Sequence, residues 1–253
     1  MGLRVMIKLE RTKMDSNRIS VKPSSITRSL GAIALFLILA STSVQLVSSL
    51  TKHNNIYGLV QLLYIDSVRN IPTFYSTFLL LVAALLLGVI IVLKRKQTNS
   101  YILQWTILSI GFLYMAADKV VSIHDVLIRP TRMLFGNGHP GIFYFAWGIP
   151  GIALLFALAL FFIRFMLHLP LKTKTTFLIA AAIYIGGAIG FELIGSRYLG
   201  SHGDNWIYKT ISTVEESLEM AGVIIFIQAL LVYIADNYEE LRVQFGQEPG
   251  GHT

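Results

Sequence analysis

The chain contains no cysteine, which excludes disulfide bonds, thiolate metal sites and cysteine nucleophiles. Charged residues are also scarce, at 14% of the 253 residues, whereas soluble domains contain about 25%. Hydrophobic residues make up 54% of the chain, and the mean hydropathy is +0.63. This composition excludes an ordinary soluble domain and predicts a polytopic membrane protein.

Long uncharged runs predict the fold class. We expect an all-α protein, a six-helix transmembrane bundle, because each run approaches the length that crosses a bilayer as a helix. Between the first two spans, apolar residues at helical spacing predict a short helix along the membrane interface; they are Ile56, Leu59, Val60 and Leu63. The predicted spans are residues 29–50, 71–93, 101–117, 142–163, 175–191 and 212–235.

The charge distribution orients these spans. The basic tail at residues 1–28, the linkers after the second and fourth spans and the polar tail at residues 237–253 hold 14 of the 21 Lys and Arg residues. Positive residues collect on the cytoplasmic side of a membrane. We therefore expect a six-span domain at residues 29–236 with both termini cytoplasmic, in a bacterial plasma membrane or thylakoid. The expected partner is the lipid bilayer, and the net charge of +7 does not indicate nucleic acid.

Local signals predict the shape and the contacts of single helices. Pro150 falls in the middle of the fourth predicted span and predicts a kink. Gly186 and Gly190 have the spacing that lets a second helix approach closely, which predicts helix–helix association and oligomerisation through them. Thr213 and Glu216 fit a capping box, which predicts that the last helix begins there.

Three acidic residues interrupt the spans at one predicted depth. Asp118 and Glu192 each lie 17 residues beyond the start of a span, and Glu219 lies 17 residues before Asp236. At 1.5 Å per residue, all three carboxylates lie about 25 Å from the cytoplasmic boundary. A carboxylate at this depth is costly unless it faces the bundle interior or a wet cavity. We therefore expect the three groups to meet inside the bundle.

Other side chains in the outer segments and on the same helices are further candidates for this site. Three histidines in outer segments are candidate metal ligands, namely His124, His139 and His202. Carboxylates and imidazoles together suit a divalent Mn, Fe or Zn ion, or a proton relay. His124 lies about 120° around the helix from Asp118 and can join it only if the helix unwinds. The candidates for a cation or proton site are Asp118, Glu192, Glu219, Glu216, Glu215, Asp125 and Tyr114.

Purely structural interpretations stand beside these candidates. Asp118 can pair with the adjacent Lys119, and Glu192 can pair with Arg197 one and a half turns later. Trp147 lies near the end of a predicted span, where tryptophan commonly anchors a helix at the membrane interface. The histidines can be ordinary loop residues.

Four short motifs resemble a group of bacterial, often cyanobacterial, membrane proteins to which no activity is assigned. The resemblance covers most of residues 30–236 and implies a helical membrane fold. In that group an acid more often stands at the position of Lys119 and Glu at that of Asp125, and these departures weaken a metal site on the third helix. The motifs are Asn70-Ile-Pro-Thr-Phe-Tyr-Ser, Asp118-Lys-Val-Val-Ser-Ile-His-Asp, Gly190-Phe-Glu and Glu215-Glu-Ser-Leu-Glu-Met.

Three functions are compatible with these observations. The first is a cation- or proton-coupled transporter of a small solute or ion, with the acids as its binding site. The second is a membrane-embedded, metal-dependent enzyme that acts on a lipid or quinone. The third is a structural or assembly subunit in which the acids pair with one another and with arginines. We rank the transporter first, and the sequence leaves any catalytic residue undetermined.

Overall fold

The computed structural model of the chain describes residues 22–51, 59–64, 70–97, 100–135 and 147–238. Every regular element within these ranges is a helix, which confirms the predicted all-α class. The longer helices are α2 (Pro23–Thr51), α4 (Ile71–Gln97), α5 (Ile102–Val121), α7 (Gly148–His168), α8 (Leu171–Ile185), α9 (Glu192–His202) and α10 (Trp206–Asn237). The shorter elements are α3 (Leu59–Leu63), the 3-10 helix η1 (Ile123–Leu127), α6 (Ile128–Phe135) and the π-helical turn η2 (Gly186–Phe191).

The lengths and hydropathies of the helices agree with a membrane protein. Five of them are long and apolar enough to cross a bilayer, when α8, η2 and α9 are counted as one continuous rod. The pair formed by α5 and the η1–α6 segment adds a sixth, broken by a bend of 81°. The short helix predicted between the first two spans is present as α3. The predicted tails lie mostly outside the described residues, although α2 begins at Pro23, within the first of them.

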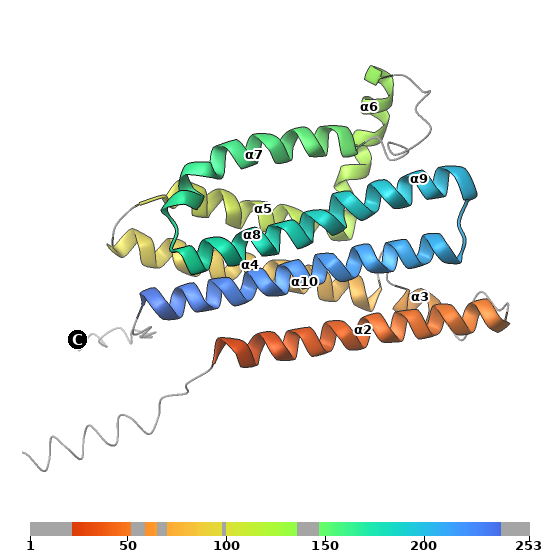
Figure 1. The fold of residues 1–253 in the computed structure, drawn as a ribbon, viewed down its shortest axis with the longest axis horizontal. Coiled ribbons are helices and arrows are strands. Elements are labelled where there is room, and N and C mark those ends of the chain that lie inside the picture. Colours follow the sequence, from red (N-terminus) through yellow and green to blue (C-terminus); the bar gives the residue numbers. More distant parts are fainter. Residues whose placement is uncertain (1–21, 52–58, 65–69, 98–99, 136–146, 239–253) are drawn as a thin grey trace, which may run out of the picture.

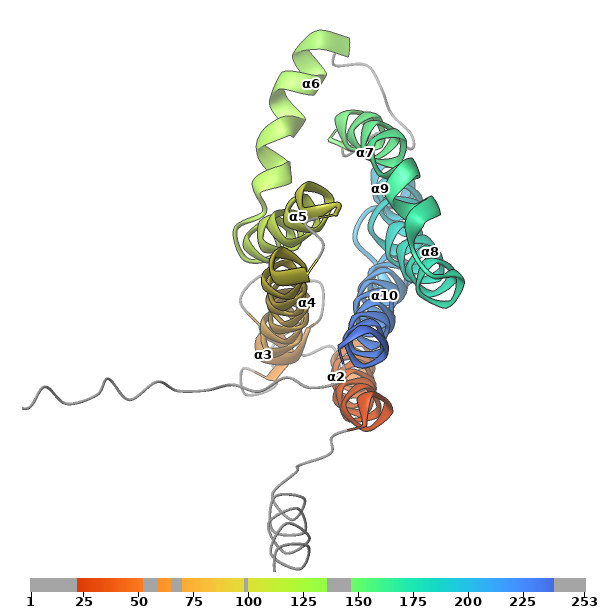
Figure 2. The same ribbon diagram turned by 90° about the vertical axis from the view of Figure 1, so that its left-hand side faces the viewer.

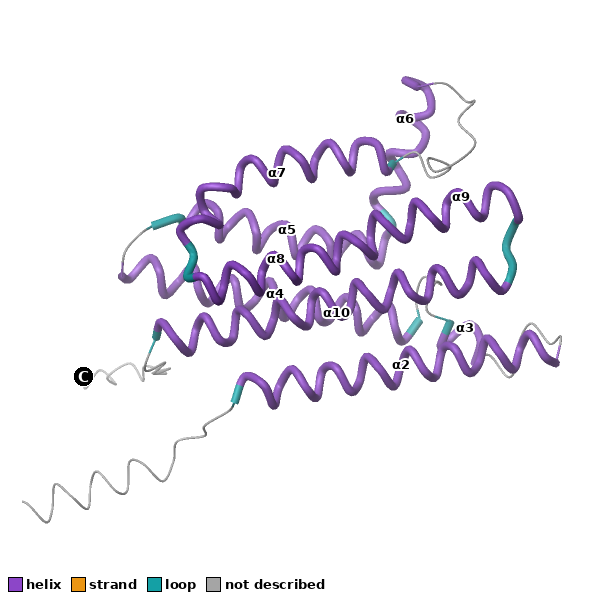
Figure 3. Tube along the Cα trace, in the orientation of Figure 1, coloured by secondary structure: helices purple, strands orange, loops and turns teal. Residues whose placement is uncertain are grey.

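The long helices lie side by side in two layers (Figures 1 and 2). α4 and α5 form one layer, and α2, α10 and the α8–η2–α9 rod form the other. The layers join where α10 packs against α4. α10 is the most buried of the five helices that are long enough to cross a bilayer, because 56% of its apolar segment is buried inside the protein. It is therefore the central helix of the bundle. Figure 3 shows how little of the described chain lies in loops.

Aromatic side chains spaced seven residues apart fill the core between the layers. Seven residues are nearly two helical turns, so Trp105 and Phe112 share one face of α5, as Phe226 and Tyr233 share one face of α10. Phe112 stacks on Phe226 with ring centroids 4.7 Å apart, and Trp105 contacts Tyr233 at 5.2 Å. Phe177 of α8 reaches Phe226 at 4.6 Å. We call these five residues the aromatic core, because they hold three helices together.

Two glycines bring α8–η2 and α10 into close contact. A Cβ atom added to Gly222 would lie 2.8 Å from the Cβ atom of Tyr184, and one added to Gly187 would lie 2.8 Å from the carbonyl oxygen of Glu215. These distances are too short for any side chain. The small residues therefore set the spacing of the two helices that form one wall of the bundle.

The glycines predicted to make this contact are different ones. A Cβ atom added to Gly186 or Gly190 would meet nothing within 4 Å. The internal close approach is at Gly187 instead, because tertiary packing, and not the four-residue spacing, decides which face of the helix meets α10. Oligomerisation through Gly186 and Gly190 stays a prediction.

Two predictions about helix ends are wrong. α7 begins two residues before Pro150, which therefore lies in the first turn, where its missing N–H costs little. α10 begins at Trp206, and Asn205 caps it by accepting hydrogen bonds from the N–H groups of the next turn. Thr213 and Glu216 thus lie inside the helix and form no capping box. The acids of α10 are consequently in a helix interior, where a capping role does not explain them.

The fifth predicted span is also longer than expected. The rod continues from η2 through α9 to His202, so Glu192 lies within it and not at its end. η2 is a π-helical turn, an irregularity that is frequent at functional sites. Glu192 is the residue that directly follows this turn.

Candidate functional site

A cavity of about 430 Å³ lies between the two layers, with walls from α4, α5, η1, α7, the α8–η2–α9 rod and α10. We call it the central cavity. The acids of the third, fifth and sixth predicted spans meet in it, as the depth argument predicted. All seven side chains proposed for a cation or proton site line it, and they are Tyr114, Asp118, Asp125, Glu192, Glu215, Glu216 and Glu219. That they bind a cation stays a prediction.

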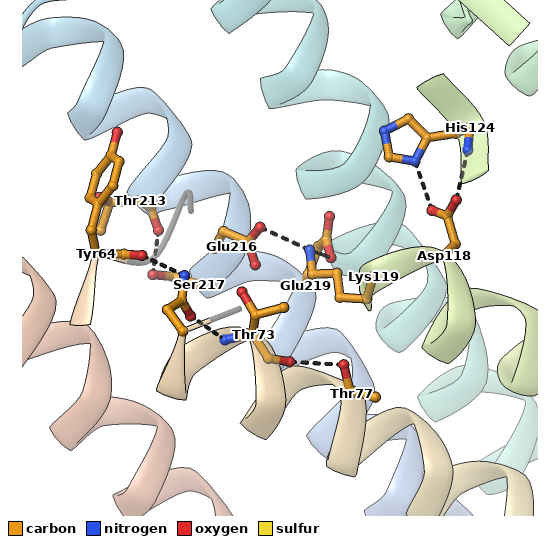
Figure 4. Close-up of polar contacts among 11 residues, drawn as sticks. Tyr64, Thr73, Thr77, Asp118, Lys119, His124, Thr213, Glu216, Ser217 and Glu219 are labelled. Atoms are coloured by element: carbon orange, nitrogen blue, oxygen red, sulfur yellow. Dashed lines mark hydrogen bonds and ion pairs between the residues drawn. The ribbon is translucent and has the colours of Figure 1, made fainter. Parts of the chain in front are cut away.

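Lys119 lines the central cavity, and its side chain joins α5 to α10 (Figure 4). Its Nζ atom donates to Glu216 Oε1 at 2.9 Å and to Glu219 Oε2 at 2.7 Å. The three side chains are only 16%, 14% and 9% exposed, respectively. Charge-assisted hydrogen bonds of this length are among the stronger polar contacts in proteins. The predicted pairing of Asp118 with Lys119 is therefore wrong, since the lysine points toward α10.

A break in α5 brings His124 to Asp118. Ser122 adopts the left-handed conformation (φ 53°, ψ 51°) directly after α5 ends. The N–H of His124 then donates to Asp118 Oδ1, and its Nδ1 lies 2.8 Å from Asp118 Oδ2. His124 Nε2 is also 3.6 Å from Asp125 Oδ1. The helix thus unwinds after Val121, which is the condition under which His124 was expected to reach Asp118. The two contacts of Asp118 with His124 stabilise the resulting bend (Figure 4).

Glu192 receives a hydrogen bond from the far wall of the cavity. The indole Nε1 of Trp147 donates to Glu192 Oε1 at 2.6 Å, and its ring lies 4.8 Å from that of His124. Trp147 therefore faces the cavity rather than only anchoring a helix end. Arg197, the predicted partner of Glu192, is exposed. These contacts link α7, η1 and α9 around one side of the cavity.

Glu215 differs from the other acids of the cavity. In the described part of the chain it makes no hydrogen bond and no ion pair, whereas each of the other five carboxylates has a partner. The lining contains six carboxylates but only Lys119 and His124 as basic groups. Acidic groups therefore outnumber basic groups in the central cavity, and Glu215 is the acid without a direct polar partner among the described residues.

The other two histidines do not take part in this arrangement. His202 lies at the exposed end of α9 and stacks on Tyr198 with ring centroids 4.5 Å apart, so it does not line the cavity. His139 lies outside the described residues. Among the residues that the structure does describe, no group of three or more His, Asp or Glu side chains could hold a metal ion.

A second, smaller cavity of about 170 Å³ lies toward the other end of the bundle. Lys94, Tyr101, His168 and Asn237 contribute polar groups to it, and Trp105 and Tyr233 of the aromatic core line it. Phe112 and Phe226 lie two helical turns closer to the central cavity. The aromatic core therefore separates the two cavities.

Residues 30–234 match a family described as a domain of unknown function (DUF8692). The chain belongs to this family. The match contains the whole lining of the central cavity, so the cavity is part of the DUF8692 domain and not of an appended segment. The chain matches no curated protein and no solved structure.

Three residues that line this DUF8692 site are not among the predicted site residues. Lys119 was considered only as a neighbour of Asp118, although it lies seven residues, or two turns, from Phe112 and so shares the inward face of α5. Tyr184 lines the cavity seven residues after the core residue Phe177 in the same way. The role of Trp147 depends on the path of the preceding loop, and no sequence signal indicated it.

Proposed function

We propose that this DUF8692 protein is a six-span membrane transporter of a small cationic solute, coupled to protons or to an inorganic cation. The observation that supports this most is the central cavity, with six carboxylates in the interior of a bundle of apolar helices. Ionisable groups in such a bundle are costly, and they commonly mark the path of an ion or a substrate. A cavity of about 430 Å³ lies within the range of small-molecule sites.

The distribution of charge supports an orientation for this transporter. Lys94, Arg95 and Lys96 end α4, and Lys172 and Lys174 begin α8 at the same end of the bundle (Figure 1). α2 starts and α10 finishes at this end too. By the positive-inside rule this end faces the cytoplasm, with both termini. The central cavity then lies toward the outer face.

We call Lys119, Glu216 and Glu219 the ion triad, and we propose that it couples ion binding to helix movement. One ammonium is shared by two carboxylates, so the triad carries a net negative charge when all three groups are ionised. A proton or a cation that reaches the triad competes with Lys119 for these oxygen atoms. Binding there would weaken the side-chain contact between α5 and α10, which lie in different layers.

The two cavities support an alternating arrangement of access. The central cavity is the outer site, the smaller cavity near Lys94 is the inner one, and the aromatic core closes the path between them. Movement of α5 relative to α10 would open this barrier, because Phe112 and Phe226 meet across those two helices. The bend at Ser122 gives the outer end of α5 a separate short segment that can move.

Ion-driven currents test the proposal. The purified full chain is reconstituted in liposomes, adsorbed on a solid-supported membrane and exposed to jumps of pH, Na⁺, K⁺, Mg²⁺ and Mn²⁺. We expect a transient current with at least one of these ions, and we expect Glu219→Gln to abolish it. Asp236→Asn is the matched control, because Asp236 is exposed at the opposite end and pairs with Lys172 at 3.7 Å.

Two outcomes would contradict the transporter. One is the absence of any current from protein that is monodisperse and folded, and the other is an unchanged current in Glu219→Gln. Elemental analysis of the same sample tests the alternative of a metal-dependent enzyme, since stoichiometric Mn, Fe or Zn would favour it.

A further inference from the structure

We propose that the solute bound in the central cavity is a small organic ammonium compound, held by the Glu215 carboxylate and by the aromatic rings around it. This inference rests on the proposed function, because it names the class of solute that the transporter would carry. It depends on three features of the cavity. They are the ammonium group of Lys119, a carboxylate without a direct polar partner among the described residues, and several aromatic side chains.

The first feature is Lys119, which is itself an alkylammonium inside this cavity. Its Nζ atom lies 2.9 Å from Glu216 and 2.7 Å from Glu219, at charge-assisted hydrogen-bond distance from both. The cavity therefore already holds one ammonium group of the proposed chemistry. Because Lys119 is tethered to α5, its direct contacts are with these two carboxylates, and neither Lys119 nor His124 makes a direct contact with Glu215 in the described part of the chain.

The second feature is the Glu215 carboxylate. It lines the cavity one residue before Glu216, and in the described part of the chain it has no hydrogen-bond or ion-pair partner. A carboxylate withdrawn from water costs free energy unless a partner compensates it. A cationic group bound beside Glu215 would supply that partner and would offset the excess of acids in the lining.

The third feature is the set of aromatic side chains in the lining of the cavity. Tyr114, Trp147, Tyr184 and Tyr208 all line it. Aromatic faces attract organic cations and are the common way in which proteins recognise substituted ammonium groups. An inorganic cation would instead favour a compact shell of oxygen ligands. Rings and carboxylates together therefore favour an ammonium with organic substituents.

The size of the cavity agrees with this class of solute. About 430 Å³ is much more than a desolvated ion fills, and it lies in the range of sites for small molecules. The apolar part of the lining includes Met115, Leu127 and Leu154, from three different elements. These side chains give the carbon substituents of an organic cation a surface to contact.

Direct binding tests the inference without requiring transport. Choline and n-butylammonium are titrated into the full chain in lipid nanodiscs, and 3,3-dimethylbutan-1-ol serves as the uncharged isostere of choline. We expect choline or n-butylammonium to bind more than about tenfold tighter than the alcohol, since both the carboxylate and the rings require the positive charge. Equal binding of choline and the alcohol, or no binding of either ammonium compound, would overturn the inference.

Variants assign the binding to the named residues. Glu215→Gln is expected to weaken ammonium binding by about tenfold or more, and Trp147→Leu by several-fold. Trp147→Phe keeps a ring but removes the N–H that bonds Glu192, so it separates the two roles of that side chain. Asp236→Asn is the control. Glu215→Ala replaces Glu215→Gln if the latter does not fold, and unchanged binding in either folded variant would remove Glu215 from the site.

The results separate this inference from the proposed function. Ion-driven currents without ammonium binding would leave the transporter in place and eliminate the organic ammonium as its solute. Ammonium binding without any current would support the cavity assignment and contradict transport.

Discussion

Lys119 shows at the level of a single residue how the interior of this bundle tolerates charge. Two carboxylates and one ammonium are nearly buried, and each contact is direct. Removing both charges of a buried ion pair is often neutral, whereas removing one partner leaves an uncompensated charge and is strongly destabilising. The triad therefore has a testable signature in stability, independent of any activity.

We expect Lys119→Met to lower the free energy of unfolding by about 3 kcal/mol, because Glu216 and Glu219 lose their shared cation. The triple substitution with Glu216→Gln and Glu219→Gln is expected to recover much of that loss. The measurement is the unfolding midpoint of each variant in one detergent. A triple variant no more stable than Lys119→Met would show that the lysine contributes by packing and not by pairing.

At the level of secondary-structure elements, two interruptions of helical geometry position the residues of the site. The break at Ser122 lets Asp118 bind His124, and the π-helical turn η2 directly precedes Glu192. α8–η2 also makes a tight contact with α10, because Gly222 and Gly187 allow the two backbones to approach closely. This contact fixes how far apart Glu192 and the acids of α10 lie.

Substitution of Gly222 tests the importance of this contact. We expect Gly222→Ala to destabilise the protein by about 1–3 kcal/mol, because the added Cβ atom would lie 2.8 Å from Tyr184 and the helices would have to separate. Gly186→Ala is the matched control, since its Cβ atom would meet nothing within 4 Å. Thermal unfolding monitored by size-exclusion chromatography gives the comparison. An equal effect of both substitutions would mean that the contact does not limit stability.

The whole molecule is an antiparallel bundle in which a group of basic residues and the acids of the cavity lie toward different ends. Basic residues lie where α4 ends and α8 begins, and the acids line a cavity nearer the connection between α9 and α10. The absence of native cysteine makes the resulting orientation directly measurable, because a single introduced thiol is the only site that a maleimide can label.

We expect Ser201→Cys to react with a membrane-impermeant maleimide in intact cells, because this exposed residue of α9 lies at the proposed outer end. Gln97→Cys, at the exposed end of α4, is expected to react only after the cells are opened. Both substitutions leave the charge unchanged, so the orientation itself is not disturbed. Labelling in the reverse pattern would place both termini outside and invert the proposed path.

Much of the architecture was predictable from sequence because apolar runs and charges act locally. The number of long helices, the short helix α3 and the depth shared by Asp118, Glu192 and Glu219 all follow from helix rise and residue counts. The helix ends were less predictable, since Asn205 and not Thr213 caps α10. The partners of the acids were least predictable: Lys119 and Trp147 reach them from other helices.

The sequence by itself determined that this chain forms apolar helices with acids set at one depth, because hydrophobicity and the 1.5 Å rise of a helix depend only on the order of residues. The tertiary structure alone decided which acid meets which partner. Seven-residue spacing places a side chain on a face, but only packing through Gly187 and Gly222 and the bend at Ser122 chooses its neighbour across the cavity. For that reason Lys119 pairs with α10, His124 joins Asp118, and Glu215 alone among the cavity acids is left without a partner in the described chain.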